Sequence, residues 1–199
     1  MDYEGVKSFM LDKLCKELSA DLYYHDLNHT LDVLHSAERL MAAENIDEYD
    51  QLLAQTACVF HDSGMLITYI GHEEASCQLA EEILPRFGYT EKELAIITKM
   101  ILTTKLPQSA TQKLEQIICD ADLDYLGRKD FFMISHRLKH EWDVHQIKTI
   151  SLKDWYKLQI SFLKNHEYFT QSARETRAAM KQENLRQILE LLNGSVSSP

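Results

Sequence analysis

Residues 57–62, Ala-Cys-Val-Phe-His-Asp, are the stretch of sequence that decides the fold. The apolar turn 57–60 is expected to pack against a core, and it carries His61 and Asp62 to the end of a predicted helix that Ser63-Gly64 terminates. Adjacent side chains on a helix diverge by about 100°, so both can reach one ion only at that end. Because burying unpaired polar side chains is costly, a bound metal explains the pair better than an exposed helix end capped by the histidine.

Helical spacing of apolar residues continues on both sides of this stretch. The 199 residues include only six glycines and three prolines, and strand-like alternation is nearly absent. We therefore predict an all-α fold, a single bundle with a long C-terminal helical segment that bends near residues 168–172. The expected helices cover approximately residues 3–18, 25–44, 47–62, 72–87 with Pro85 distorting the last turn, 90–102, 114–127, a seventh that begins near 130, and 151–192.

The composition is that of a soluble globular protein, with 45% hydrophobic and 26% charged residues. The net charge of −10 argues against nucleic-acid polymers and anionic membranes as main partners, because both require clustered Lys and Arg. No apolar run approaches the ~20 residues of a membrane-spanning helix, and the first residues lack the pattern of a signal peptide. The four cysteines form no C-x-x-C pair, which is typical of reduced thiols in a cytoplasmic protein.

Two histidines near the start of the second predicted helix form a candidate site. His25 and His29 are four residues apart, which places both on one helix face. Such a pair can bind one metal ion, or one histidine can bind the ion while the other transfers protons. Two surface histidines at a helix start fit the same spacing.

Three carboxylates, Asp120, Asp122 and Asp124, lie inside an otherwise apolar helical segment. A spacing of two does not place them on one helix face, so at most one or two can point to a common centre. The surrounding isoleucines and leucines leave little room for a solvated face. We expect at least one of the three to be buried and paired with a cation, and we choose Asp122.

Taken in order, these segments resemble the HD-domain metal-dependent phosphohydrolase superfamily. The resemblance rests on Tyr24-His25-Asp26-Leu27-Asn28-His29, His61-Asp62 and Asp120-Ala121-Asp122, and it covers about residues 20–130. It implies a compact HD-type helical bundle in which the metal ligands are His29, His61, Asp62 and Asp122. The expected organisation is one domain, residues 1–193, with its metal-binding core at about 20–130 and a disordered tail at 194–199.

The Tyr-His-x-x-x-His start is also similar to the cyclic-nucleotide phosphodiesterase branch. That resemblance implies that His25 donates a proton to the departing oxygen of the substrate. The chain differs from the branch because Asp26 replaces an Asn and because the chain is much shorter. A cyclic-nucleotide substrate is therefore not inferred.

Several further residues could contact a substrate or support the ligands. His72 could hold a second metal ion, bind a phosphate oxygen or cap a surface helix, and Glu73 or Glu74 could orient a ligand histidine. Lys105 and Arg128 could bind a phosphate, although an ordinary surface charge is the simpler interpretation of each. We expect a structural role for the segment that contains His136, His140, Glu141, Trp142 and His145.

Two nitrogen and two oxygen ligands suit manganese, iron, nickel, cobalt or zinc, and magnesium less well. Only His72 is available as a further histidine between Asp62 and Asp122, so we expect one ion, with a second at most weakly bound. The predicted function is a divalent-metal-dependent phosphohydrolase that cleaves a phosphomonoester or phosphodiester through a metal-activated water. Its expected partner is a nucleotide or another small phosphate ester, with His25 as acid and Asp62 or Asp122 as acceptor of the proton from water.

Two other functions fit the same ligands. One is an HD-type di-iron oxygenase, against which the shortage of further histidines counts. The other is a non-catalytic sensor that binds a metal ion and a nucleotide and uses its C-terminal helices as a partner or homodimer surface. Packing of those helices against the bundle explains their apolar positions more simply.

Overall fold

The structure is a computed structural model that describes residues 1–194, and residues 195–199 lie outside the described part of the chain. Helices provide all the regular structure of residues 1–194, which confirms the predicted all-α class. Their order is α1 (Tyr3–Glu17), α2 (Leu27–Ala43), α3 (Glu48–Phe60), η1 (Ser63–Leu66), α4 (His72–Ile83), η2 (Leu84–Phe87), α5 (Glu91–Thr104), α6 (Lys113–Asp122), η3 (Asp124–Gly127), α7 (Phe131–Val144), α8 (Leu152–Asn165) and α9 (Gln171–Gly194). Of the predicted disordered tail, 194–199, only Gly194 is described, and it ends α9.

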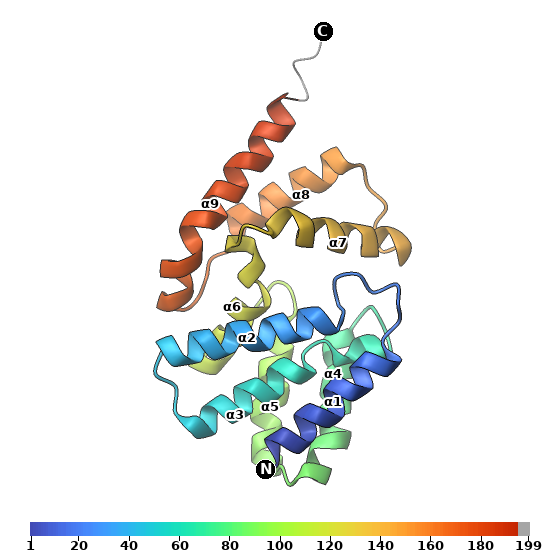
Figure 1. Cartoon of the computed structure of the whole chain (residues 1–199), viewed down its shortest axis with the longest axis vertical. Helices are drawn as coiled ribbons and strands as arrows, with labels where there is room; N and C mark the ends of the chain where they lie inside the picture. Colours follow the sequence, from blue (N-terminus) through green and yellow to red (C-terminus); the bar gives the residue numbers. More distant parts are fainter. Residues whose placement is uncertain (195–199) are drawn as a thin grey trace.

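The helices form two groups (Figure 1). Helices α1 to α6 make the larger group, with the N-terminus at its lower end, while α7, α8 and α9 lie above α2 and α6. Each group has its own cluster of buried apolar side chains. The apolar positions of α8 and α9, among them Leu163 and Ile188, belong to the second cluster together with Phe131 of α7. These apolar side chains therefore pack within the fold, which was the simpler explanation for them than a partner or homodimer surface.

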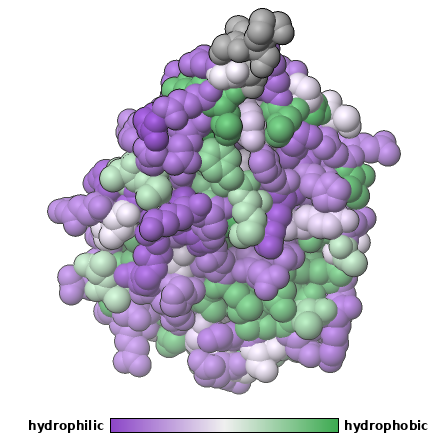
Figure 2. All heavy atoms as spheres, turned by 45° about the horizontal axis from the view of Figure 1, so that its top comes forward, coloured by the Kyte–Doolittle hydropathy of each residue, from purple (hydrophilic) through white to green (hydrophobic). Residues whose placement is uncertain are grey.

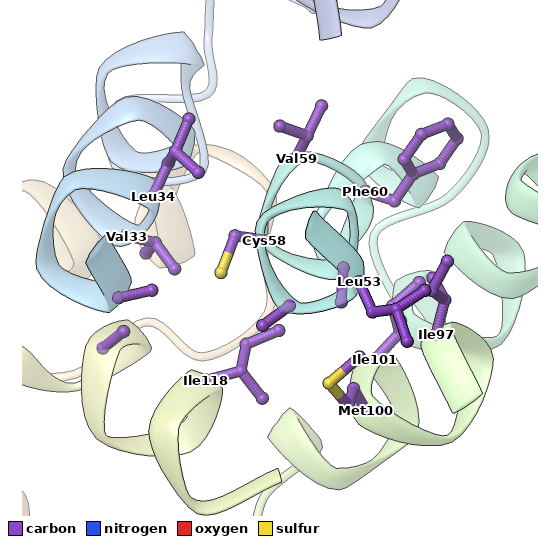
Figure 3. Close-up of a cluster of buried hydrophobic side chains, with 14 of the residues drawn as sticks. Val33, Leu34, Leu53, Cys58, Val59, Phe60, Ile97, Met100, Ile101 and Ile118 are labelled. Carbon is purple, nitrogen blue, oxygen red and sulfur yellow. The ribbon is translucent and has the colours of Figure 1, made fainter. Parts of the chain in front are cut away.

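Helix α3 lies at the centre of the larger group (Figure 3). Its residues Leu53, Cys58 and Phe60 are fully buried, with Cys58 directed towards α2 and α6 and Leu53 towards α5. Asp47 starts the helix by accepting a hydrogen bond from the backbone N–H of Asp50. The apolar turn that precedes His61 is therefore in the core, and it fixes the position of that histidine.

Two expected helices are interrupted. The predicted helix 114–127 ends as α-helix at Asp122 and continues as the tighter turn η3. The predicted C-terminal segment 151–192 does not bend but breaks into α8 and α9. The reason for the break is the buried Asp120 carboxylate, which accepts hydrogen bonds from the backbone N–H groups of Phe169 and Thr170 at 2.8 and 2.7 Å. Thr170 also donates its hydroxyl to Asp120 at 2.7 Å.

Gly64 allows η1 to pack closely against α4. A Cβ atom at Gly64 would lie 1.9 Å from the carbonyl oxygen of His72, so no other residue fits without displacing the backbone. Ser76 joins the two elements, because its hydroxyl accepts from Gly64 N–H at 2.7 Å and donates to the carbonyl oxygen of His61 at 2.8 Å. This contact fixes the His61-Asp62 pair beside the first turn of α4.

Glu115 at the start of α6 makes stability depend on pH. Its buried carboxylate accepts backbone hydrogen bonds from Thr111 and Gln112 and pairs with Lys99. Burial raises the pKa of Glu115, but these partners outweigh it and lower the pKa to about 2. Its stabilisation is therefore present above the ordinary value of 4.5 and is lost as the pH falls towards 2.

We therefore expect Glu115→Gln to lower the free energy of unfolding at pH 7 by about 1–2 kcal/mol, the usual cost of losing a helix cap. At pH 3 the difference between the variant and the wild type should shrink. Urea unfolding at both pH values measures it. An equal difference at pH 7 and pH 3 would show that the Glu115 carboxylate does not contribute in its ionised form.

On the face drawn in Figure 2, hydrophilic residues cover most of the surface and apolar residues gather in separate patches. Among the described residues, no helix combines the length and the apolar character that crossing a bilayer requires.

Candidate metal centre and active-site cavity

Three segments far apart in the sequence bring four side chains to one place. His29 lies in the first turn of α2, where the Asp26 side chain caps the helix by accepting the His29 N–H at 2.9 Å. His61 follows the last residue of α3, Asp62 comes next, and Asp122 is the last residue of α6. The structure thus brings all four predicted ligands together, while their role as ligands stays a prediction.

The facing atoms of these side chains lie within a few ångströms of one another. The Nε2 atoms of His29 and His61 are 3.3 Å apart. Asp62 Oδ2 lies 3.3 Å from the first and 3.1 Å from the second, and Asp122 Oδ1 lies 3.2 Å from the first and 3.8 Å from the second. Two ligands bound about 2.1 Å from an ion are roughly 3.0 Å apart at right angles and 3.4 Å apart at the tetrahedral angle. Most of the observed distances fall in that interval.

The tautomer of His61 shows that this cluster fits a cation. Its Nδ1 lies 2.8 Å from the carbonyl oxygen of Cys58, so in the neutral ring Nδ1 donates the hydrogen bond and Nε2 carries a lone pair. That lone pair faces His29 Nε2 and two carboxylate oxygens in a site where His61 is fully buried. Carboxylates and imidazole nitrogens that converge in a buried site require a positive charge, which either a proton on a histidine or a metal ion can supply. The group formed by His29, His61 and Asp122 could hold a metal ion.

The carboxylates determine the charge of the site. Burial lowers the pKa of His29, but the hydrogen bonds to Asp122 and Asp62 outweigh it and raise the pKa to about 10. Burial alone would raise the pKa of Asp62, but the neighbouring histidines outweigh this effect and hold the pKa well below its usual range. A proton and a metal ion are therefore attracted to the same atoms and compete for them.

Residues 26–124 match the family model of the HD domain. These residues form an HD domain. An uncharacterized protein from Clostridium beijerinckii is 32% identical over 100 residues, which are 48% of this chain and 58% of that protein, so the match spans less than two thirds of the relative. A crystal structure of a predicted HD superfamily hydrolase from an uncultured Thermotogales bacterium aligns with 96% of this chain and 91% of its own, with a TM-score of 0.60 and 20% identity. At that identity the likeness shows that the fold is shared.

In this HD domain the three aspartates of the Asp120–Asp124 segment point in three directions. Asp120 holds the start of α9, and Asp124 pairs with Arg177 Nε at 2.7 Å and Arg39 at 3.1 Å. Only Asp122 faces the histidines. The aspartate that is buried and paired with basic side chains is therefore Asp124, not Asp122, which is partly exposed and faces His29 in the candidate metal centre.

Glu141 of α7, for which we expected a structural role only, contacts the candidate acid His25, a contact that sequence reasoning missed. Its carboxylate accepts the backbone N–H groups of Tyr24 and His25 at 2.7 and 3.0 Å, and it also contacts Nδ1 of His25. The hydroxyl of Tyr69 donates to it at 2.7 Å. Burial raises the pKa of Glu141, but His25 and these donors lower it to about 2, so the carboxylate is ionised. No signal near Glu141 in the sequence indicates contacts with residues 116 positions away.

The predicted substrate-binding residues have different positions. Nε2 of His72 lies 3.3 Å from Asp62 Oδ1, and the His72 ring centre is 5.4 Å from that of His25. Lys105 lines the cavity beside the metal centre and forms an ion pair with Glu74.

Arg128 does not reach this cavity, which corrects its prediction as a phosphate-binding residue. Its guanidinium contacts the carboxylates of Asp32 and Asp130 at 2.7 and 2.6 Å, in a separate depression behind Tyr24. Pairing with two carboxylates leaves it little charge to offer a phosphate.

Neither glutamate after His72 orients a ligand histidine as expected. Glu74 is paired with Lys105, and Glu73 lies 3.7 Å from Nε2 of His72. The backbone of Cys58 takes that role for His61 instead, because the end of α3 places its carbonyl oxygen within reach.

A cavity of about 430 Å³ opens beside the metal centre, within the range of small-molecule sites. Asp62, Asp122, His25, His72 and Lys105 line its polar end. Much of its apolar lining comes from α7 and α8, among it Leu138, Trp142, Trp155 and Leu158.

Proposed function

We propose that this HD-domain protein is a divalent-metal-dependent phosphohydrolase that acts on a nucleotide or another small phosphate ester. The observation that supports it best is that nitrogen and oxygen atoms of His29, His61, Asp62 and Asp122 converge beside the cavity, which the two aspartates line. The structural neighbour is a predicted HD superfamily hydrolase, and a hydrolytic reaction agrees with this proposal.

These four residues would hold the ion. When bound, a divalent ion lowers the pKa of a coordinated water from about 15.7 towards 7 and polarises the phosphoryl group. Asp62 faces both the histidine nitrogens and His72, so it can accept the proton that the attacking water loses. His72 and Lys105 add positive charge at the same end of the cavity, where they would offset the charge of the phosphate.

His25 would protonate the oxygen of the departing group. Glu141 fixes the imidazole through Nδ1 and also holds the backbone of His25, so the other ring nitrogen is left for the substrate. His25 lines the cavity and lies beside His72, which places it within the reach of a bound ester. Glu141 is thus a positioning residue for the proposed acid.

A di-iron oxygenase has less support. A second ion needs additional ligands, and among the described residues only His72 adds a ring nitrogen within 3.3 Å of Asp62. The oxygenase would consume oxygen with two irons per chain, whereas the phosphohydrolase requires neither.

The leaving group of the substrate tests both the reaction and the role of His25. With added manganese, the wild type should hydrolyse a 4-nitrophenyl ester and an alkyl ester of phosphate. His25→Ala and Glu141→Gln should lower kcat on the alkyl ester by about 100-fold, the usual size of general acid catalysis. Both should retain most of the activity on 4-nitrophenyl phosphate, because its leaving group departs without a proton.

His140→Ala is the matched control for His25→Ala, since His140 lies on α7 outside the cavity lining. It should retain activity on both esters. Equal loss on the two esters in His25→Ala would exclude proton donation by His25. A wild type that cleaves neither ester nor any nucleotide with any divalent ion would overturn the proposed function.

A further inference from the structure

Helices α7 and α8 form a hairpin that makes one wall of the cavity. Both helices join the rest of the molecule beside α9, while the far end of α7 lies close to the loop between α1 and α2 (Figure 1). Trp142 and Leu158 of the hairpin line the cavity together with Asp62 and Asp122 of the candidate metal centre. The hairpin therefore has a base at α9 and a tip, the turn 145–151, beyond the cavity.

The base of the hairpin is held firmly by α9. The side-chain amide of Asn184 donates to the carbonyl oxygen of Arg128, just before α7, at 2.8 Å. Lys181 donates to the carbonyl oxygen of His166, the residue that ends α8. Apolar side chains of α7, α8 and α9 also share one buried cluster. Separating the base would expose that cluster to water, which is costly.

Two side chains near the tip, Glu141 and His145, hold it against the larger group of helices, and we call them the clasp. The Glu141 carboxylate accepts the backbone N–H groups of Tyr24 and His25 at 2.7 and 3.0 Å. Nε2 of His145 lies 3.2 Å from the carbonyl oxygen of Asp21. Water can replace each of these hydrogen bonds when the clasp opens, so their net contribution is modest.

Tyr69 connects the clasp to a second loop, residues 67–71. Its hydroxyl donates to Glu141 at 2.7 Å, and its ring lies against that of His145 with the centres 4.9 Å apart. This loop leads directly into α4 and His72. The clasp thus joins the tip of the hairpin to the two loops that precede His29 and His72.

Part of the cavity lining is closed while the clasp is made. Leu123, Tyr125 and Trp155 are lining residues, yet each is at most 5% exposed. A ligand larger than water reaches them only if the walls separate. Because the base is fixed by α9, the wall that can separate is the tip of the hairpin.

We propose that the α7–α8 hairpin is a movable cover and that its closure positions the proposed acid. With the clasp made, Glu141 holds both the backbone and Nδ1 of His25, and these contacts are lost when the tip withdraws. A bound ester then meets a fixed imidazole only after the cover has closed over it. The role of His25 rests on the proposed function, whereas the movement of the cover does not.

Hydrogen exchange of two backbone amides reports on the cover without any turnover. The N–H groups of Tyr24 and His25 donate to Glu141, so their exchange requires that this contact opens. The N–H groups of Phe169 and Thr170, which donate to a buried carboxylate at the base, are the reference. By NMR of the full chain we expect the first pair to exchange at least about 100-fold faster than the second. Equal protection of both pairs would overturn the proposal.

A cross-link distinguishes movement of the hairpin from movement of the loop that carries His25. Ile147, in the turn after α7, and Ile70, just before α4, both line the cavity. Ile70→Cys and Ile147→Cys are combined with Cys15→Ser, since Cys15 is the exposed thiol, and are joined by a bifunctional methanethiosulfonate. We expect the cross-link to slow exchange of the His25 and Tyr24 amides at least about 10-fold and reduction to restore it. Unchanged exchange would assign the opening to the loop and overturn the proposal.

Tyr69→Phe should loosen the clasp without touching the base. The change removes the hydroxyl that donates to Glu141 and retains the aromatic ring. We expect the amides of Tyr24 and His25 to exchange about 10-fold faster, the usual effect of losing one hydrogen bond to a charged group.

His136→Ala is the matched control for this variant. His136 also lies on α7, but its Nε2 contacts the hydroxyl of Tyr156 on α8, within the hairpin, at 3.2 Å. Exchange of the two amides should equal that of the wild type. If Tyr69→Phe also exchanged like the wild type, the clasp as described would be wrong.

Kinetics separates this inference from the proposed function. With manganese, Tyr69→Phe should lower the ratio of kcat on an alkyl phosphate to kcat on 4-nitrophenyl phosphate about 10-fold, because only the alkyl ester needs the acid. The cross-link should lower kcat on both esters until it is reduced. Hydrolysis of both esters with neither effect would refute the inference and retain the phosphohydrolase. Amide opening that the cross-link suppresses, with no ester cleaved by the wild type, would refute the phosphohydrolase and retain the cover.

Discussion

His61→Ala is expected to remove the bound metal ion and to lower phosphate-ester hydrolysis by more than about 100-fold. Loss of a residue that only supports a metal ligand lowers metal affinity or activity by up to about 100-fold. His61 would be a ligand itself, so its loss should have a larger effect. The site would keep His29 and two carboxylates, but its remaining acceptors would not enclose the ion. Metal content by elemental analysis and initial rates with manganese measure the two effects.

His35→Ala is the matched control. His35 lies on α2, the helix that carries His29, but its side chain is 75% exposed. It should keep the metal content and the rate of the wild type. If His61→Ala kept them as well, the ion would be held elsewhere and the account would be wrong.

Asp120→Ala should destabilise the protein by about 3 kcal/mol, whereas Asp122→Ala should not. The buried Asp120 carboxylate accepts three hydrogen bonds from Phe169 and Thr170 at 2.7–2.8 Å, and without it three donors lose their acceptor. For a chain of this length, a loss of that size lowers Tm by about 10 °C. Asp122 makes no comparable contact with α9.

Metal binding should show the reverse order. Asp120→Ala, measured well below its own Tm, should bind the ion like the wild type, while Asp122→Ala should lose it. For each variant, thermal unfolding in the presence of a chelator measures the Tm without metal. Metal titration below the unfolding transition measures the metal affinity. If both variants lost metal affinity, or both lost stability, the separate roles of Asp120 in stability and of Asp122 in metal binding would be contradicted.

Local signals explain why the helices could be predicted. The capping box of Thr90 and Glu93 is present at the start of α5, and Gly88 with a φ of 77° follows the turn that contains Pro85. Each of these features depends on residues within one or two turns. The convergence of the candidate ligands could be predicted for another reason. The His61-Asp62 pair, followed later in the chain by the acidic segment, resembles the pattern of a known family.

Contacts between the two groups of helices could not be predicted in this way. Glu141 lies 116 residues after His25, and nothing in its own segment distinguishes it from a solvated glutamate. Arg128 looks available in the sequence, but its neighbours Asp130 and the distant Asp32 occupy it. The break before α9 depends on Asp120, which lies about 50 residues earlier. Tertiary packing decides all three.

The most direct measurement of the central claim is pulsed electron paramagnetic resonance of the protein loaded with one equivalent of manganese. Convergence of the four side chains predicts magnetic coupling to two imidazole nitrogens. His61→Ala, which does not retain the ion, should show neither coupling, His29→Ala should show at most one, and His35→Ala should retain both. A spectrum of the bound ion without any histidine nitrogen would contradict the account.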